Sequence, residues 1–395
     1  MAKKRDLAAA KSGKKDEFYT QLTDIEKEMR YYRKHFKNKT VMCNCDDPFE
    51  SNFFKYFALN FNRLGLKKLI ATCYYSSPIA GQQLQYSFDS NDQMSFCFEN
   101  KIEKGSKSKR PYKAVVTQVY DTTGDGGVDM LDVAELFKSG ENELVELEGD
   151  GDFRSSECLA LLDEADIVVT NPPFSLFRDY VAVLMEHQKH FIIIGNVNAL
   201  TYKEIFPLIM ENKLWFGASI HSGDRKFYVP DDYPLNAAGC GIDEDGRRYI
   251  RVKGVRWYTN LDLKQRHEEM ILVKRYNPEQ YPTYDNYDAI EVSKTNDIPC
   301  DYAGLMGVPI TFMDKYSPDQ FEILGTSDNG LVSDEYKTTP GLTQEFVDDY
   351  YNAGGTGAYK AGNPTAGLYK NGIATMIYKR IFIRNKHPEP SKEVK

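Results

Sequence analysis

The chain has 395 residues, enough for one large α/β domain and a smaller second one. It has no run of about 18 apolar residues and its basic N-terminus lacks an apolar core, so we expect neither membrane contact nor a signal peptide. Seven cysteines without a Cys/His cluster indicate reduced thiols and a cytoplasmic location. The net charge of −8 argues against a protein that coats nucleic acid by charge alone.

Short apolar runs alternate with segments of helical periodicity through the first half of the chain. In chain order the predicted elements are a helix at 24–36, a strand at 40–45, a helix carrying Phe53 and Phe61, a strand at 69–73, a helix at 155–163, a strand at 166–170, a helix at 175–187, a strand at 191–195 and a helix at 201–211. Continuously apolar strands separated by helices predict an α/β fold with a parallel sheet that is covered on both faces.

The remaining segments differ in character. Residues 1–15 are predicted to form a disordered basic arm, and the polar stretch at about 80–148 to be an insertion. After Trp215 the predicted strands lie at 214–220, 225–229 and 248–258, and a final β-like run at 373–384.

The strand at 166–170 runs directly into Asn171-Pro-Pro-Phe. The Asn171 side-chain oxygen and the Pro172 carbonyl are acceptors suited to the N–H bonds of an exocyclic amine on adenine or cytosine. Phe174 offers an apolar face to a flipped base, and Pro172 and Pro173 stiffen the turn. The alternative is an ordinary proline-rich loop between a strand and a helix.

Acidic side chains stand at further strand ends. Asp46 and Asp152, like Asn171, lie at or just after such ends, where parallel α/β sheets bind their ligands. A carboxylate followed by an aromatic ring, Asp152-Phe153, suits the amine and the base of a nucleotide cofactor. The alternative is a flexible acidic turn.

Phe18, Tyr19 and Thr20 precede the first predicted helix. Aromatic rings attract a sulfonium through cation–π interaction, and Thr20 is able to cap the helix or to bond the methionine end of a cofactor. Aromatic pairs of this kind are also common in hydrophobic cores.

The segment at 121–132 has the spacing of an EF-hand loop. Oxygen ligands for calcium at positions 1, 3, 5, 9 and 12 would come from Asp121, Thr123, Asp125, Asp129 and Asp132. Threonine is a weak ligand, and position 12 holds aspartate instead of the longer glutamate. A self-capped acidic turn is therefore the alternative to a structural calcium ion.

Basic residues gather in runs at 3–15, 101–113 and 247–256, although the chain is acidic. Local patches of this kind set the field near a phosphate backbone. The candidate DNA contacts are His221, Arg225, Arg251, Lys253 and Arg256. For each arginine the alternative is a surface ion pair.

Several motifs occur in a fixed order: Asp16-Glu-Phe-Tyr-Thr-Gln, Cys43-Asn-Cys-Asp-Asp-Pro-Phe, Gly149-Asp-Gly-Asp-Phe-Arg-Ser, Asn171-Pro-Pro-Phe-Ser-Leu-Phe-Arg, Gly195-Asn-Val-Asn, His221-Ser-Gly-Asp-Arg, Gly254-Val-Arg-Trp and Gly307-Val-Pro-Ile-Thr-Phe. Together they resemble the EcoRI-type adenine-specific DNA methyltransferases, over the chain to about residue 325.

The resemblance implies a class I methyltransferase fold, Rossmann-like, with a mostly parallel seven-stranded sheet. It implies an S-adenosylmethionine-dependent catalytic domain at 16–275, a target-recognition region at 276–395, and methyl transfer to adenine N6 in double-stranded DNA. A restriction-modification role, a cognate endonuclease that forms no stable complex, a monomeric state and the site GAATTC are further expectations.

By matching motif, Phe18, Tyr19 and Thr20 would line the methionine side of the cofactor. Asn44, Asp46 and Pro48 would stand at the first loop, Asp152 and Phe153 would meet the cofactor's adenine, and Asn171 to Phe174 would form the catalytic loop. The chain departs from the usual pattern in two places: it has no G-x-G, and Thr72-Cys-Tyr replaces the acidic ribose ligand.

Two alternatives stay open at this point. One is a methyltransferase of the same fold that acts on RNA or on a protein glutamine, because Asn-Pro-Pro-aromatic suits any planar amine or amide. The other is a DNA-binding relative that has lost turnover.

Overall fold

The computed structural model describes residues 19–45, 51–73, 83–88, 94–99, 111–137, 140–221, 223–229, 235, 239–328, 330, 333 and 338–390. The predicted basic arm at 1–15 lies outside these residues. The chain divides into a first unit, Met1–Val197 with Ser222–Leu261, and a second unit, Asn198–His221 with Asp262–Lys395. The segment 198–221 groups with the C-terminal unit, and the predicted functional domains at 16–275 and 276–395 stay predictions.

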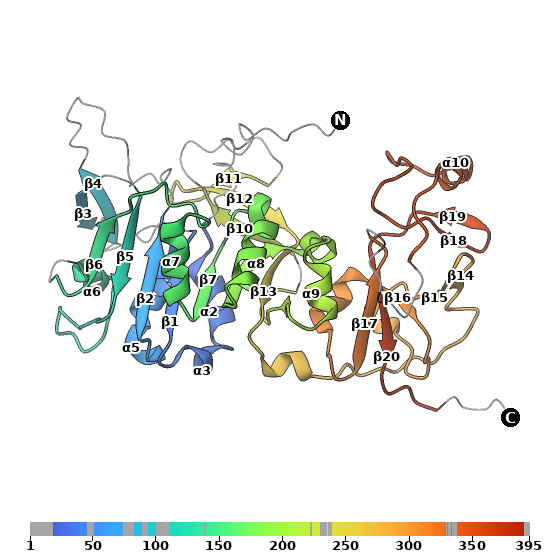
Figure 1. The fold of residues 1–395 in the computed structure, drawn as a ribbon, viewed down its shortest axis with the longest axis horizontal. Coiled ribbons are helices and arrows are strands. Elements are labelled where there is room, and N and C mark those ends of the chain that lie inside the picture. Colours follow the sequence, from blue (N-terminus) through green and yellow to red (C-terminus); the bar gives the residue numbers. More distant parts are fainter. Residues whose placement is uncertain are drawn as a thin grey trace. The chain divides into compact units, whose positions relative to one another are not determined.

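The first unit is built on a sheet whose centre is parallel. Its strands β2 (Lys68–Thr72), β1 (Thr40–Cys43), β7 (Ile167–Thr170) and β8 (His190–Asn196) pair in that order, all in parallel (Figure 1). Every residue of β1 and β7 is buried, which explains why these strands are apolar except for one terminal threonine in each.

Antiparallel strands extend this sheet on both sides. β13 (Val255–Thr259) pairs with β8, while β5 (Tyr112–Val116) and β6 (Glu143–Glu146) follow β2. The sheet is therefore mixed, and the expectation of a mostly parallel sheet holds only for its centre. The stretch at about 80–148, predicted as an insertion, contributes β5 and β6 to the sheet.

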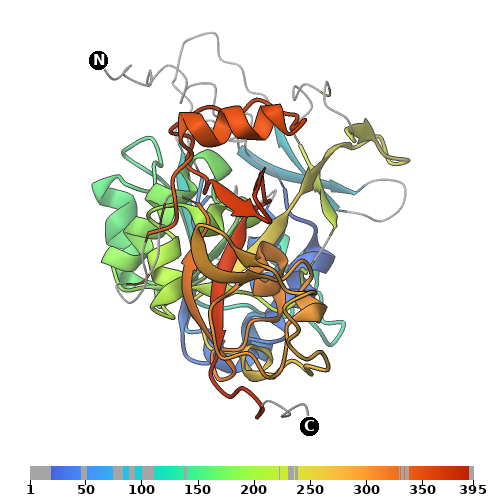
Figure 2. The same ribbon diagram turned by 90° about the vertical axis from the view of Figure 1, so that its right-hand side faces the viewer.

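Helices lie on both sides of the large sheet in the first unit. Figure 2 shows the green helices α7 (Ser156–Glu164) and α8 (Phe177–Glu186) on the opposite side from the blue N-terminal helices. The Ser155 hydroxyl accepts a hydrogen bond from the Cys158 amide and so fixes the start of α7. Both helices were predicted, to within two residues at each end.

The other elements of the first unit are α2 (Leu22–Met29), α3 (Arg33–Phe36), α4 (Asn52–Leu59), α5 (Phe61–Leu64), β3 (Gln83–Phe88), β4 (Met94–Glu99), α6 (Met130–Glu135), the 3₁₀ helix η2 (Phe174–Leu176), β10 (Asp224–Tyr228), β11 (Gly241–Ile242) and β12 (Arg248–Lys253). The single helix predicted at 24–36 is thus divided into α2 and α3.

The second unit contains a five-stranded sheet in the order β14-β15-β16-β20-β17. Its elements are η3 (Val197–Thr201, which begins at the unit boundary), α9 (Phe206–Met210), β9 (Trp215–Phe216), η4 (Lys264–His267), β14 (Thr283–Tyr284), β15 (Tyr287–Glu291), η5 (Thr295–Asp297), β16 (Met306–Pro309), η6 (Ile310–Lys315), β17 (Phe321–Thr326), α10 (Gln344–Asn352), β18 (Leu368–Lys370), β19 (Ile373–Thr375) and β20 (Arg380–Asn385). The predicted helix at 201–211 shortens to α9, and the predicted final strand divides into β19 and β20.

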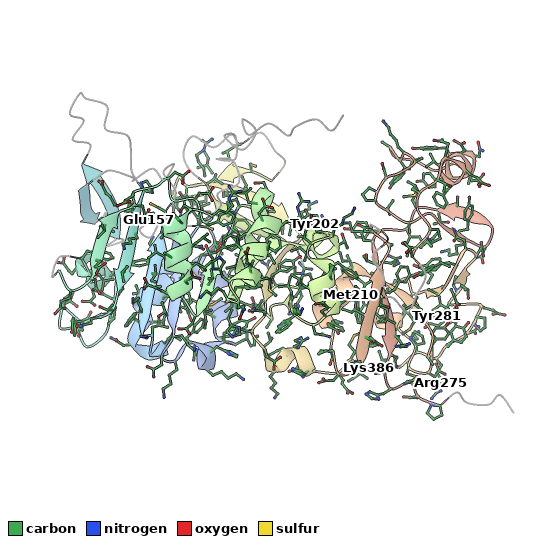
Figure 3. The ribbon with its side chains drawn as sticks, viewed as in Figure 1. Glu157, Tyr202, Met210, Arg275, Tyr281 and Lys386 are labelled. Carbon is green, nitrogen blue, oxygen red and sulfur yellow. The ribbon has the colours of Figure 1, made fainter. Side chains whose placement is uncertain are left out.

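Polar contacts tie the C-terminal end of the second unit to earlier segments. The Arg275 guanidinium contacts Asp301 at 3.1 Å and Glu389 at 2.6 Å. The Lys386 ammonium donates to the Pro318 carbonyl at 2.5 Å. Arg275 and Lys386 are both labelled in Figure 3. These contacts show that residues up to 389 belong to the folded unit.

His267 bridges two carboxylates in the second unit. Its Nδ1 lies 2.8 Å from Asp319 and its Nε2 lies 2.9 Å from Asp262, and these hydrogen bonds raise its pKa. Protonated His267 therefore stabilises the fold below the unfolded pKa of about 6.5, and this contribution disappears as the pH rises through the folded value.

We expect His267→Asn to destabilise the protein more at about pH 5.5 than at about pH 8.5, by at most about 1 kcal/mol because the group is exposed. Urea unfolding of both proteins at each pH measures the difference. An equal loss of stability at both pH values would contradict the assignment.

Candidate active site

Asparagine residues follow two adjacent parallel strands at the same edge of the sheet. Asn44 follows β1 and Asn171 follows β7. Met42 lies opposite Val168, so continuing the register places Asn44 beside Thr170, next to Asn171. Both asparagines are buried. This edge is where parallel α/β sheets bind ligands.

A buried tyrosine joins three of the elements around this edge. The Tyr180 hydroxyl, on α8, donates a hydrogen bond to the Asn44 side-chain oxygen. Burial holds the pKa of Tyr180 well above its usual range. The Phe153 ring packs edge-on against Tyr180, with ring centroids 5.0 Å apart. The predicted cofactor residues Asn44 and Phe153 are thus brought together by a residue that the sequence did not single out.

Asp152 is held by its neighbour Arg154. The guanidinium donates to both carboxylate oxygens, from Nε at 2.9 Å and from Nη2 at 2.7 Å. These hydrogen bonds lower the pKa of Asp152, so the carboxylate stays ionised at neutral pH. An ionised carboxylate is an acceptor for an amine, which is the role predicted for Asp152.

The Asn171-Pro-Pro-Phe loop is fixed at both ends. Thr170 is fully buried in β7, and the Leu176 amide donates to the Pro173 carbonyl at 2.9 Å. Pro172 is buried, whereas Phe174 keeps part of its surface exposed. The loop therefore carries a partly exposed aromatic residue three positions after a buried asparagine.

The helix that follows this loop depends on Gly195. The Phe177 ring, at the start of α8, packs against Tyr258 with centroids 4.9 Å apart. A Cβ atom added at Gly195 would lie 2.5 Å from Phe177 Cε2 and 2.9 Å from Tyr258 Cε2. Only glycine leaves room for both rings.

Gly195→Ala should therefore destabilise the protein by about 1–3 kcal/mol, because the rings must move out of a packed core. Chemical denaturation measures the loss. Gly127→Ala is the control, since a Cβ atom there has no heavy atom within 4 Å. Equal stability of the two variants would contradict the packing argument.

The N-terminal segment predicted to line the cofactor adds to the edge of β10. Tyr19 and Tyr228 exchange backbone hydrogen bonds of 2.9 and 3.2 Å. The Thr20 carbonyl accepts a hydrogen bond from Asn52 at 2.7 Å. Phe18, Asp46 and Pro48 lie outside the described residues, so their predicted roles stay predictions.

Buried hydroxyl groups provide a test of whether these residues fit a polar cofactor. Thr20 Oγ1 and Thr72 Oγ1 are buried, and neither has a hydrogen-bond partner among the described residues. Thr72 ends β2, which pairs in parallel with β1. Buried polar groups are normally hydrogen-bonded, so both hydroxyls fit the role of ligand contacts.

The predicted calcium loop is not supported. Asp121 accepts hydrogen bonds from the amides of Gly124 and Gly126, which lower its pKa. Asp132 accepts from the amides of Thr122 and Asp129. In the part of the chain that is described, no group of three or more ligand side chains is placed to hold a metal ion. Asp121 to Asp132, with Thr123, Asp125 and Asp129, instead form the self-capped turn.

The predicted DNA contacts are distributed over several elements. Arg225 lies on β10, whereas Arg251 and Lys253 lie on β12. Arg256 lies on β13 and is only 4 % exposed, with Nη1 donating to the Val255 carbonyl, so it does not belong to an exposed basic patch. His221 is exposed and belongs to the second unit.

Comparisons with known proteins extend over most of the chain. The family described as "Adenine-specific methyltransferase EcoRI" matches residues 6–386. The "Type II methyltransferase M.EcoRI" of Escherichia coli is 48 % identical over 322 residues, 80 % of this chain and 88 % of its own. The "Type II methyltransferase M.MpnI" of Mycoplasma pneumoniae is 34 % identical over 357 residues, 89 % of this chain and 94 % of its own.

No solved structure matches the chain significantly. None of the helices in the described ranges has the length and apolar character needed to cross a bilayer. The family match and the identities to Type II methyltransferases agree with the motif order in the sequence. The chain therefore belongs to the EcoRI-type family of adenine-specific methyltransferases.

Proposed function

We propose that this chain transfers the methyl group of S-adenosylmethionine to N6 of an adenine that is flipped out of double-stranded DNA, as part of a restriction-modification system. Membership of the family supports a DNA adenine methyltransferase. The observation that carries the proposal is the buried Asn171 at the carboxyl end of β7, followed by a stiff Pro-Pro-Phe turn.

The adenine amine is a poor nucleophile because its lone pair is delocalised into the ring. The Asn171 side-chain oxygen and the Pro172 carbonyl would accept hydrogen bonds from its two N–H groups. These bonds would draw the nitrogen towards tetrahedral geometry. This geometry localises the lone pair on the nitrogen and directs it towards the methyl group that is to be transferred. S-adenosylmethionine, when bound, supplies an electrophilic methyl group on a good leaving group.

The base has to leave the duplex before it reaches these acceptors. Flipping costs a few kcal/mol of lost stacking and pairing. Phe174, whose ring keeps exposed surface, would recover part of this cost by stacking on the extruded adenine. The prolines hold the acceptors in place before the substrate arrives.

The cofactor would bind along the same sheet edge. We assign Phe18, Tyr19 and Thr20 to its methionine side, and Asn44 with the neighbouring Asp46 and Pro48 to the first loop. Asp152 and Phe153 would receive its adenine, and the Thr72 hydroxyl would take the place of the usual acidic ribose ligand. The ionised Asp152 and the buried Thr20 and Thr72 hydroxyls support this assignment.

The region at 276–395 is proposed to recognise the target sequence. The finer expectations of a class I, Rossmann-like fold, of a monomer, and of a separate endonuclease that shares the site belong to the same proposal. The parallel order β2-β1-β7-β8 supports the first of these.

Incubation with labelled S-adenosylmethionine and unmethylated duplex DNA tests the proposal. Nucleoside analysis should yield N6-methyladenine, and GAATTC is the first site to examine. Label on RNA or on protein glutamine, but not on DNA, would favour the second reading of this fold. Binding of DNA without any methyl transfer would favour the alternative of a DNA-binding relative that has lost turnover.

A further inference from the structure

The strands β10, β12 and β11 form a separate antiparallel sheet in the first unit. Cross-strand partners lie on the same face of a sheet, and the register pairs Asp224 with Lys253, Lys226 with Arg251, and Tyr228 with Tyr249. These six side chains therefore share one face, which we call the basic–tyrosine face. The residues Phe227 and Ile250, on the opposite face, are buried.

The register divides the predicted DNA contacts on this sheet between its two faces. Arg225 lies opposite Val252 and so belongs to the face that contains the buried Phe227. Lys226, one residue later, lies with Arg251 and Lys253. Alternation along the strand thus places Lys226, and not Arg225, on the face that carries Arg251 and Lys253.

Cations and tyrosine rings interleave on the basic–tyrosine face. The Lys226 ammonium lies 4.4 Å from the centroid of Tyr249 and 5.0 Å from that of Tyr228. The Arg247 guanidinium, from the turn before β12, lies 4.5 Å from the centroid of Tyr228. Such contacts hold long, flexible cations in fixed positions.

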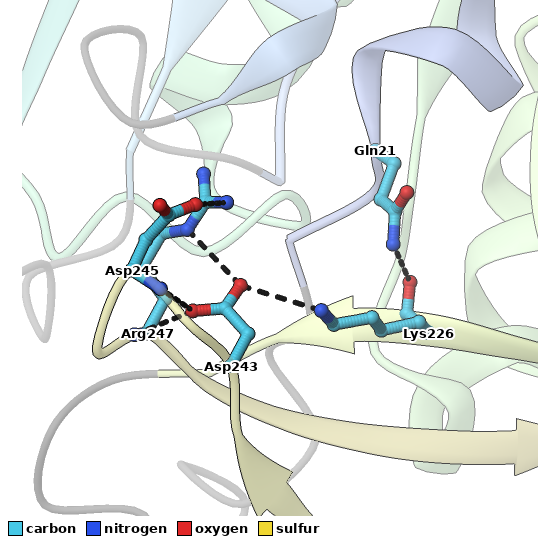
Figure 4. A network of polar contacts seen from close by, with 5 residues as sticks. All are labelled: Gln21, Lys226, Asp243, Asp245 and Arg247. Atoms are coloured by element: carbon cyan, nitrogen blue, oxygen red, sulfur yellow. Dashed lines mark hydrogen bonds and ion pairs between the residues drawn. The ribbon is translucent and has the colours of Figure 1, made fainter. Parts of the chain in front are cut away.

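A carboxylate beneath the cations orders them further (Figure 4). The Asp243 carboxylate pairs with Lys226 Nζ and with Arg247 Nε, both at 3.3 Å. The Asp243 side chain is 13 % exposed, whereas that of Arg247 is 51 % exposed. Burial opposes ionisation of Asp243, but bonds from Arg247, Tyr228 and Lys226 outweigh it and lower its pKa to about 2. Asp243 therefore stays charged and less exposed than the two cations, while Arg247 also pairs with the exposed Asp245 at 2.5 Å.

The strand that carries Lys226 is also joined to the segment proposed to bind the cofactor. Gln21 Nε2 donates a hydrogen bond to the Lys226 carbonyl at 3.1 Å (Figure 4). Tyr19 pairs with Tyr228 through backbone hydrogen bonds. The basic–tyrosine face is therefore attached directly to residues 19–21, on the cofactor side of the first unit.

We propose that the basic–tyrosine face binds the phosphate backbone of duplex DNA, with Lys226 and Arg251 as phosphate contacts and Tyr228 and Tyr249 as their supports. Lysine, arginine and tyrosine are the usual donors to phosphate oxygens, and such contacts position a duplex without reading its sequence. The face and the turn before β12 carry four cations, Lys226, Arg247, Arg251 and Lys253, against three carboxylates, Asp224, Asp243 and Asp245. Arg251 itself pairs with Asp224 at 3.5 Å, so a small local excess of positive charge is what attracts phosphate in this otherwise acidic chain. This inference rests on the proposed function.

The test is the salt dependence of binding to a short fluorescent duplex that carries GAATTC and to a scrambled duplex. The slope of log K against log salt is negative. Lys226→Gln and Arg251→Gln should each make it less steep by about 0.9, equally on both duplexes. Lys226→Arg keeps the charge and should restore the slope. Arg251→Gln, at an exposed position, keeps the test usable if Lys226→Gln fails to fold.

Lys68→Gln is the matched control. Lys68 has a carboxylate partner, Glu164, at 2.9 Å and a side chain 29 % exposed, against 27 % for Lys226. Its slope should equal that of the wild type. Folded Lys226→Gln and Arg251→Gln proteins with wild-type slopes would overturn the proposal, even if the wild type methylates DNA. A reduced slope without any DNA methylation by the wild type would retain the surface and reject the proposed function.

Discussion

Replacing Asn171 by alanine should lower the rate of methyl transfer by about 10²- to 10³-fold or more, while the affinity for S-adenosylmethionine stays within a few-fold. The reason is that the Asn171 oxygen acts on the reacting amine, whereas the proposed cofactor contacts are spread over several elements. Single-turnover methylation of duplex DNA gives the rate, and calorimetric titration gives the affinity.

Two further variants make this result specific. Asn171→Asp keeps a side-chain oxygen at the same place and should retain more activity than Asn171→Ala. Asn60→Ala removes an asparagine at the end of α4, away from the strand ends, and should leave the rate unchanged. Parallel loss of activity, cofactor binding and thermal stability in Asn171→Ala would show that Asn171 maintains the fold instead.

The elements around the catalytic loop could be predicted because local and tertiary signals agree there. β7 is buried along its whole length, β8 carries the buried apolar run Phe-Ile-Ile-Ile, and α7 begins at a serine cap. Each of these features is set by residues that are close together in the sequence.

The prediction failed where pairing partners, not local composition, decide the structure. β6 is the exposed segment Glu-Leu-Val-Glu, whose two apolar residues are too few to predict a strand, and it pairs with β5. At 121–132 the sequence left calcium and a self-capped turn as alternatives, since a ligand spacing and such a turn use the same carboxylates. Arg225 and Lys226 could not be distinguished before the register was known.

In the candidate site, too, the local motif was predictable from the sequence and the long-range contact was not. Asn171 to Phe174 is a local motif and was found from the sequence. Tyr180 was missed, because its contact with Asn44 joins residues 136 positions apart. The one available signal was the apolar stripe of α8, in which a tyrosine shares the buried side with Phe177.

Removing Glu291 should have the largest effect on stability in the second unit. Its carboxylate pairs with the Arg380 guanidinium at 2.6 Å, and both residues are buried. The Tyr284 hydroxyl also donates to Glu291, and burial with the Glu291 charge holds the pKa of Tyr284 well above its usual range. Glu291→Leu leaves a buried guanidinium without its counter-charge, so we expect a loss of about 3–5 kcal/mol in the free energy of unfolding.

Glu322→Leu is the control, because Glu322 pairs with Arg384 across β17 and β20 of the same sheet at 2.7 Å, with side chains 41 % and 30 % exposed. Solvent screens this pair, so its loss should cost at most about 1 kcal/mol in urea denaturation. A combined Glu291→Leu and Arg380→Met variant should recover most of the stability lost in Glu291→Leu, since no buried charge then remains. If that variant is no more stable than Glu291→Leu, the penalty comes from packing of the sheet and not from an uncompensated charge.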